Sequence, residues 1–194
     1  MGRKRTAVTV VSMIVLAAAI IAVYYYWSNR TEPLSNAEKS LTENQKLINK
    51  DLVQNYPETP KEVTKIFASI MKAIYSNPKE EEIKPLALKV RELYDDELLA
   101  NNPENTYLTN LYSDLANWKK KNRIITNFLL VKEDEEEQKE IDGIKYATKY
   151  ISFTIQQNIK FTETWKVLLR QNEEEQWKIM GWSYIKDDNS KSEN

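Results

Sequence analysis

The chain of 194 residues contains no cysteine and no histidine. Without cysteine it cannot form disulfide bonds, thiolate zinc sites, iron–sulfur clusters or cysteine nucleophiles. Without histidine it lacks the commonest metal ligand and the usual general base, so hydrolases built on a Ser–His or Cys–His pair are excluded. We therefore expect no metal site, no cofactor and no enzymatic activity.

Glycine is scarce as well, with 3 residues, which argues against a glycine-rich phosphate-binding loop. Hydrophobic residues make up 41% and charged residues 29%, proportions typical of a folded chain. Residues 1–30 contain four basic residues and no acidic one, so 24 bases face all 29 acids in the remainder. A mildly acidic domain is poorly suited to nucleic acid, and we expect no nucleic-acid partner.

One uncharged run, residues 7–27, is long enough for a transmembrane helix, which needs about 20 residues. It ends in the aromatic residues 24–27, which suit the interface between lipid and water. Arg3, Lys4 and Arg5 precede the run, so the positive-inside rule predicts a cytoplasmic N-terminus and an extracytoplasmic C-terminal domain. The sequence thus predicts a single-pass protein of the cell membrane, held in the lipid bilayer by residues 7–27.

The alternative for this run is a cleaved signal peptide, because the alanines at positions 17–19 offer a small-residue cleavage site. The run continues well past them, which favours an uncleaved anchor. The predicted organisation is a cytoplasmic tail (1–6), a transmembrane helix (7–27), a juxtamembrane linker and helix (28–58), a folded extracytoplasmic domain (59–186) and a disordered tail (187–194).

Helical patterns occupy the first half of the domain. Ser35 opens a capping-box pattern for the juxtamembrane helix, which either packs on the domain, floats or pairs with itself. Thr59 and Pro60 then supply the N-cap and first position of the clearest helix, and Pro85 suits the start of a second that continues to Leu98. A third helix is predicted after Pro103.

After Asn122 the spacing of apolar residues changes from helical to alternating. Four strands are predicted there, over 124–131, 144–157, 161–169 and 177–184. An acidic loop, residues 133–142, separates the first two. Short turns between strands predict an antiparallel meander, and helices followed by strands indicate the α+β class. In the last strand, simple alternation places Trp182 and Tyr184 on the face opposite Trp177 and Ile179.

The closing strands, Thr-Glu-Thr-Trp-Lys-Val-Leu-Leu at 162–169 and Gln-Trp-Lys-Ile-Met-Gly-Trp at 176–182, resemble those of the nuclear transport factor 2-like superfamily. The resemblance covers roughly residues 59–186. It implies a cone in which three helices pack on a curved four-stranded antiparallel sheet around an apolar interior. Stretches at 49–52, 55–63 and 96–103 are also similar to an uncharacterised family of single-pass bacterial membrane-anchored proteins.

Four residues of the closing strands are candidate binding residues. Glu163 occurs at every-second-residue spacing with Phe161 and Trp165, and this spacing could place its side chain on the apolar face of the strand. The alternative is that Glu163 is exposed at an edge. An acid in an apolar pocket would match the enzyme sites of ketosteroid isomerase-like members of the superfamily. Trp165, Trp182 and Tyr184 either line a ligand pocket or partner groove or belong to the core.

Other acidic groups are better explained as solvated surface. The run at 133–137 lacks the ligand spacing and internal glycine of a calcium loop, and Asp95, Asp96 and Glu97 point in different directions if they lie on a helix. Our main hypothesis is therefore a membrane-anchored extracytoplasmic module that binds a protein partner or self-associates. The alternative is a membrane-tethered domain that binds a small ligand, or acts as an enzyme, through the cone interior.

Overall fold

The structure is a computed structural model and describes residues 41–131 and 138–185. Five helices precede five strands in these residues, so the described fold is α+β. In chain order the elements are α3 (Glu43–Ile48), α4 (Pro60–Tyr75), α5 (Glu80–Arg91), α6 (Asp96–Asn101), α7 (Glu104–Lys120), β1 (Ile124–Leu130), β2 (Gln138–Ile141), β3 (Ile144–Gln156), β4 (Lys160–Gln171) and β5 (Trp177–Ile185).

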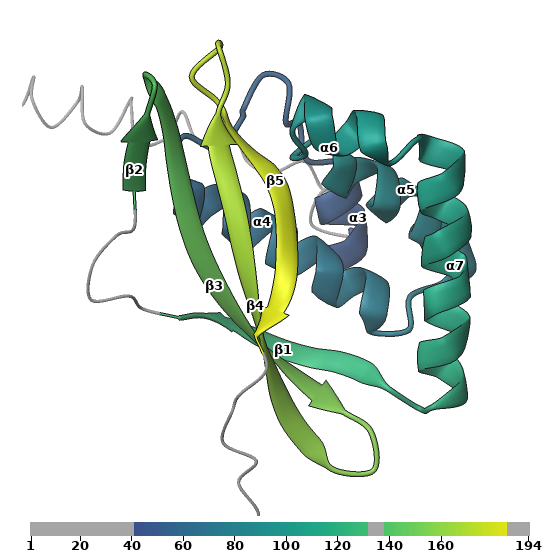
Figure 1. Cartoon of the computed structure of the whole chain (residues 1–194). Helices are drawn as coiled ribbons and strands as arrows, with labels where there is room; N and C mark the ends of the chain where they lie inside the picture. Colours follow the sequence, from purple (N-terminus) through teal and green to yellow (C-terminus); the bar gives the residue numbers. More distant parts are fainter. Residues whose placement is uncertain (1–40, 132–137, 186–194) are drawn as a thin grey trace, which may run out of the picture. The chain divides into compact units, whose positions relative to one another are not determined.

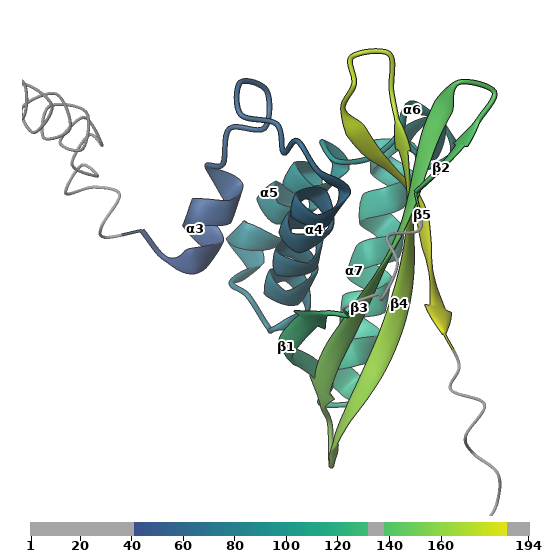
Figure 2. The same ribbon diagram turned by 90° about the vertical axis from the view of Figure 1, so that its left-hand side faces the viewer.

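The strands form one antiparallel sheet in the order β1-β3-β4-β5 (Figure 1). The long strand β3 pairs with β4 along one side. Its other side is shared, because β2 pairs with its first residues and β1 with its last. Figure 2 shows the sheet from its edge, with α3, α4, α5 and α7 on one side of it. The opposite face of the sheet carries no described helix.

Helix α4 provides the main contact between the helices and the sheet. The Thr59 hydroxyl accepts a hydrogen bond from the Glu62 N–H, and the Glu62 carboxylate accepts one from the Thr59 N–H, each at 3.2 Å. The apolar side chains of α4 recur at helical spacing, so one face of the helix is buried along its length. Burial of each large apolar side chain contributes roughly 1.5–3 kcal/mol. The fully buried members are Val63, Phe67, Ala68, Ile70 and Ile74.

The helical part differs from the sequence prediction in two places. Helix α5 begins at Glu80 and contains Pro85, whereas the prediction started the helix near that proline. It also ends at Arg91, because the following segment leaves the helix and pairs with β5: the Ile179 N–H donates to Leu93 O (2.8 Å) and the Asp95 N–H donates to Ile179 O (2.9 Å). The predicted continuation to Leu98 is a separate helix, α6.

The prediction of four strands is wrong, because β2 is a fifth. It pairs with β3 through a two-residue turn in which Asp142 and Gly143 have φ of 53° and 79°. Positive φ at both positions is the geometry of a type I′ hairpin turn. All four residues of β2 are exposed, so no alternation of polar and apolar residues marked it in the sequence.

The predicted membrane topology also needs correction. No helix in residues 41–131 or 138–185 is long and apolar enough to cross a bilayer. The predicted spanning segment, residues 7–27, lies outside the described residues, as does the Ser35 capping box. The structure therefore does not support the prediction of a single-pass, membrane-anchored extracytoplasmic protein, and that prediction is withdrawn.

Candidate functional site

A bulge in β5 decides which way the candidate aromatic residues point. Leu168 of β4 pairs with Gly181, but its neighbour Leu169 pairs with Ile179, so Met180 has no partner in β4. An extra residue in one strand reverses the alternation of the residues beyond it. Trp182 and Tyr184 therefore lie opposite Val167 and Trp165, on the same face as Trp177 and Ile179 and not on the opposite one as predicted.

Trp165 and Tyr184 have different environments although they face each other. Trp165 is 2% exposed and stands edge-on to Phe153, with ring centroids 4.7 Å apart. Tyr184 is 61% exposed, and its ring contacts the Trp165 indole edge-on at 5.0 Å. Trp165 is thus a core residue, and Tyr184 is a surface aromatic supported by it.

Trp182 is partly buried and packs toward the helices. Its indole lies 5.1 Å from the Phe67 ring of α4 and 5.5 Å from the Tyr94 ring. Tyr94 is itself buried and makes an edge contact with Tyr107 of α7 at 6.2 Å. Burial raises the pKa of the Tyr94 hydroxyl well above its usual value.

Glu163 lies on the inner face of β4, where it forms an ion pair with Arg123. The Arg123 guanidinium also lies over the Trp118 ring, 4.2 Å from its centroid, and 5.4 Å from that of Phe161. Aromatic faces attract such a cation. The carboxylate is therefore neutralised by a fixed cation, unlike the free buried acid that a ketosteroid isomerase-like site would need.

A second carboxylate lies in the same region, on α7. The Tyr75 hydroxyl donates a hydrogen bond to Asp114 Oδ2 at 2.6 Å, and the Tyr75 ring packs on Trp118 at 4.5 Å. Burial and this hydrogen bond raise the pKa of Tyr75. Burial, followed by the charge of Glu163, also raises the pKa of Tyr184.

These contacts gather aromatic side chains of α4, α7 and the sheet into three contacting groups, which together are called the aromatic cluster. Sequence reasoning found its β-strand members and missed the helical ones and Arg123, because nothing in a helix pattern shows which strand a side chain will meet. Two buried N–H donors, Arg123 Nε beside the cluster and Trp165 Nε1 within it, have no hydrogen-bond partner among the described residues. The tyrosine and tryptophan members of the aromatic cluster are Tyr75, Tyr94, Tyr107, Trp118, Trp165, Trp182 and Tyr184.

Asp95 has a structural role. It is 4% exposed and accepts from Arg170 through both oxygens, at 3.0 Å from Nε and 2.5 Å from Nη2. The same side chain caps α6 by accepting from the Glu97 N–H at 3.0 Å. Its carboxylate is therefore fully engaged in joining α6 to β4, and it is no part of a paired-carboxylate site.

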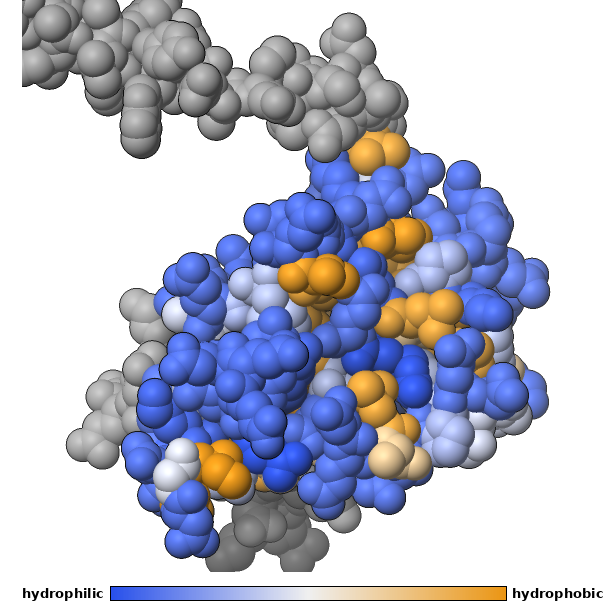
Figure 3. All heavy atoms as spheres, turned by 90° about the horizontal axis from the view of Figure 1, so that it is seen from above, coloured by the Kyte–Doolittle hydropathy of each residue, from blue (hydrophilic) through white to orange (hydrophobic). Residues whose placement is uncertain are grey.

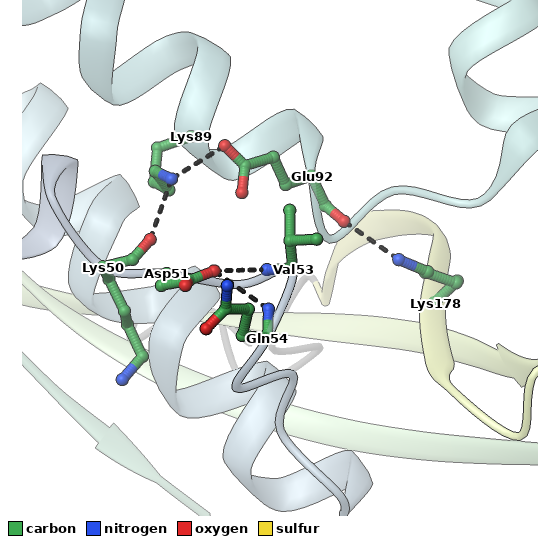
Figure 4. A network of polar contacts seen from close by, with 7 residues as sticks. All are labelled: Lys50, Asp51, Val53, Gln54, Lys89, Glu92 and Lys178. Carbon is green, nitrogen blue, oxygen red and sulfur yellow. Dashed lines mark hydrogen bonds and ion pairs between the residues drawn. The ribbon is translucent and has the colours of Figure 1, made fainter.

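A second polar network fixes the segment after α3 (Figure 4). Lys89 donates to the Lys50 carbonyl and pairs with Glu92, both at 2.8 Å, while the Asp51 carboxylate accepts from two following N–H groups. Lys178 of β5 donates to the Glu92 carbonyl at 3.1 Å. Burial lowers the pKa of Lys178. These bonds tie the loop after α3 to α5, and the end of α5 to β5, so their role is structural.

Metal binding finds no support in the described part of the chain, where no three acidic side chains gather closely enough to hold an ion. The acidic run at 133–137 lies outside the described residues. Figure 3, which views the molecule from above, shows apolar patches separated by hydrophilic side chains. That face therefore offers no broad apolar contact surface.

Residues 1–182 match the family model described as Domain of unknown function (DUF6715). The chain belongs to this family. The match extends from the first residue to Trp182 of β5, so it includes the aromatic cluster except Tyr184. No curated protein matches the chain. The resemblance to the nuclear transport factor 2-like superfamily remains a prediction.

Proposed function

We propose that the DUF6715 chain is a non-catalytic protein-interaction or assembly module whose contact surface is centred on Tyr184. The observation that carries the proposal is the support of this residue: an aromatic side chain 61% exposed, held edge-on against a tryptophan of the core. Rigid, partly supported aromatics are typical anchors of protein interfaces, because they bury a large area and lose little conformational freedom on binding.

The surroundings of Tyr184 support the same function. Ile185 follows it and is 39% exposed, so the end of the strand also presents an apolar side chain on its opposite face. The nearby acid Glu163 is neutralised by Arg123, and this pairing favours a binding surface over acid–base chemistry. An interface built this way has an apolar centre and a charged pair at its rim.

The proposal is tested with Tyr184→Ala and a matched surface control, Tyr112→Ala, at a residue 40% exposed on α7. Chemical cross-linking in intact cells at native expression should yield an adduct with the wild type and with the control, and none with Tyr184→Ala. Unfolding of the purified variants must show that both remain folded. A wild-type chain that yields no adduct, or an adduct indifferent to Tyr184→Ala, defeats the proposal.

A second candidate function, binding of a small ligand within the aromatic cluster, is favoured by the buried donors Arg123 Nε and Trp165 Nε1. Buried donors without a partner cost free energy that a hydrogen-bond acceptor would recover. A neutral aromatic carbonyl compound has the matching chemistry. Ligand-observed NMR with acetophenone should show saturation transfer that Arg123→Ala weakens, and no transfer from the wild type argues against this function.

A further inference from the structure

The outer edge of β5 is divided into a closed half and an open half. In the closed half, both backbone groups of Ile179 bond to the segment before α6, through Leu93 and Asp95. Beyond the bulge at Met180, residues 181–185 have no backbone partner on this edge among the described residues. An unpaired edge is a template for another strand.

The pairing with β4 shows which groups the open half presents. Ile179 points its N–H and C=O away from β4, and it lies opposite Leu169. In an antiparallel pair of strands, the backbone N–H and C=O groups of two opposite residues either point toward each other or point away from each other. This direction alternates from one residue to the next along each strand. Val167 and Trp165 lie two and four residues from Leu169, so their backbone N–H and C=O groups point the same way as those of Leu169. Their partners Trp182 and Tyr184 therefore turn their N–H and C=O groups outward, as Ile179 does.

Those outward groups are arranged symmetrically about Ser183. A second copy of the strand, running antiparallel across a two-fold axis at Ser183, would place its Tyr184 opposite Trp182 and its Trp182 opposite Tyr184. Each such pair exchanges two hydrogen bonds, so all four outward groups on each strand are satisfied. Both pairs are aromatic, and cross-strand aromatic pairs stabilise a sheet. The isologous contact closes on itself without leaving a new edge.

The composition of β5 also favours pairing of its open edge with another strand. Residues 179–185, Ile-Met-Gly-Trp-Ser-Tyr-Ile, contain no charge and no proline, the usual devices that keep an edge strand unpaired. No like charges would meet at the seam. The other edge of the sheet is made by β1, which packs beside α4, and by the short strand β2, which carries the charged residues Lys139 and Glu140.

We propose that two copies of the chain pair through residues 181–185 of β5, giving a continuous sheet across a two-fold axis at Ser183. The inference rests on the proposed function, since it identifies the protein that binds the Tyr184 surface as a second copy of the chain. The bond between Ile179 and the segment before α6 limits the overlap to these five residues.

The absence of native cysteine permits a direct test in the full-length chain. Residues facing each other without mutual hydrogen bonds in an antiparallel pair have Cα atoms about 4.5 Å apart, within the range that a disulfide spans. Ser183→Cys should therefore form a disulfide-linked dimer under mild oxidation. Ser113→Cys, at an exposed position on α7, is the matched control and should stay monomeric.

Ser183→Glu provides an independent readout. The new carboxylate lies opposite Lys166 in its own sheet, so the fold is retained, but it meets its own copy across the axis. Light scattering should show a wild-type dimer, a dimer for Ser183→Thr, and loss of the dimer for Ser183→Glu.

A monomeric wild type without a Ser183→Cys disulfide overturns the pairing, as does equal cross-linking of the two cysteine variants or a Ser183→Glu chain that stays dimeric. If the Tyr184-dependent adduct then contains a different protein, the proposed function survives with another partner. If no such adduct exists, both proposals fail.

Discussion

The Tyr184 ring meets the Trp165 indole edge-on, with centroids 5.0 Å apart and ring planes at 86°. The two residues are cross-strand partners in β4 and β5. One is 2% exposed and the other 61%, so the contact marks the boundary between core and surface. Truncating either residue breaks the same contact, and the two truncations should nevertheless have different consequences.

Trp165→Ala should lower the free energy of unfolding by about 3–5 kcal/mol, because it opens a cavity against Phe153 in a closely packed core. Tyr184→Ala should cost less than about 1.5 kcal/mol, since most of that side chain is already in water. Urea unfolding followed by circular dichroism measures both. Equal losses would mean that Tyr184 belongs to the core, which removes the basis for its role as an anchor.

Asp95→Ala should destabilise the domain by roughly 3–5 kcal/mol, because it leaves Arg170 without its buried partner and removes the cap of α6. Glu97→Ala is the matched control. Glu97 reaches the same arginine at 3.7 Å but its side chain is 67% exposed, so its loss should cost about 1 kcal/mol or less. A double-mutant cycle with Arg170→Ala should show strong coupling for Asp95 alone. Comparable effects of the two single variants would contradict a structural role for Asp95.

Local rules predicted much of this fold correctly. The Thr59 cap, the α4 stripe and the change of period after Asn122 all follow from neighbouring residues, and each occurs in the structure. The break between α5 and α6 does not, because it is imposed by hydrogen bonds to Ile179, which is remote in sequence. β2 was missed since all of its residues are exposed.

The candidate site shows the same division. The inward direction of Glu163 was among the predicted alternatives, but its partner Arg123 was not predicted, because the two residues are joined only by the tertiary fold. Alternation alone assigned Trp182 and Tyr184 to the wrong face. A bulge has no sequence signature as plain as a cap or a proline, so the reversal at Met180 becomes visible only in the pairing.

Buried tyrosines make the stability of the domain sensitive to alkaline pH. The folded protein holds the pKa of Tyr75 and of Tyr94 above the unfolded value of about 10, chiefly through burial. A raised pKa means that the unfolded chain loses these protons first as pH increases. The stabilisation is thus complete below about pH 10 and declines as the pH rises toward the folded-state pKa.

Tyr75→Phe should flatten the fall in unfolding free energy above about pH 10, because one of the shifted groups is gone. It should also lower stability at neutral pH, where the hydrogen bond to Asp114 is lost. Tyr112→Phe, which removes an exposed hydroxyl from α7, is the matched control. Urea unfolding between pH 8 and pH 11 measures the slopes, and a Tyr75→Phe slope equal to that of the wild type would count against the buried tyrosine.

Helix capping offers a comparison between a core helix and a peripheral one. Thr59→Ala should cost about 0.5–2 kcal/mol, because it removes the hydroxyl that accepts from Glu62 at the start of α4. Thr42→Ala removes the equivalent bond at α3, a six-residue helix without a buried residue. Fraying of α3 should therefore absorb that loss with little effect on global unfolding. A larger global effect at Thr42 would show that α3 is integral to the cooperative unit.

Deletion of Met180 tests whether this residue is the extra one in β5. Without it, Ile179 and Gly181 become neighbours opposite Leu169 and Leu168, so regular alternation keeps Trp182 opposite Val167 and on its present face. Trp182 then keeps its contacts with Phe67 and Tyr94, and the deletion should cost less than about 1.5 kcal/mol, as should Met180→Ala, the control that keeps the residue count. Tryptophan fluorescence should keep its wild-type wavelength in both variants. A deletion variant whose emission shifts to longer wavelength, or that loses the roughly 2–4 kcal/mol expected when Trp182 leaves these contacts, would show that the register beyond Gly181 depends on Met180.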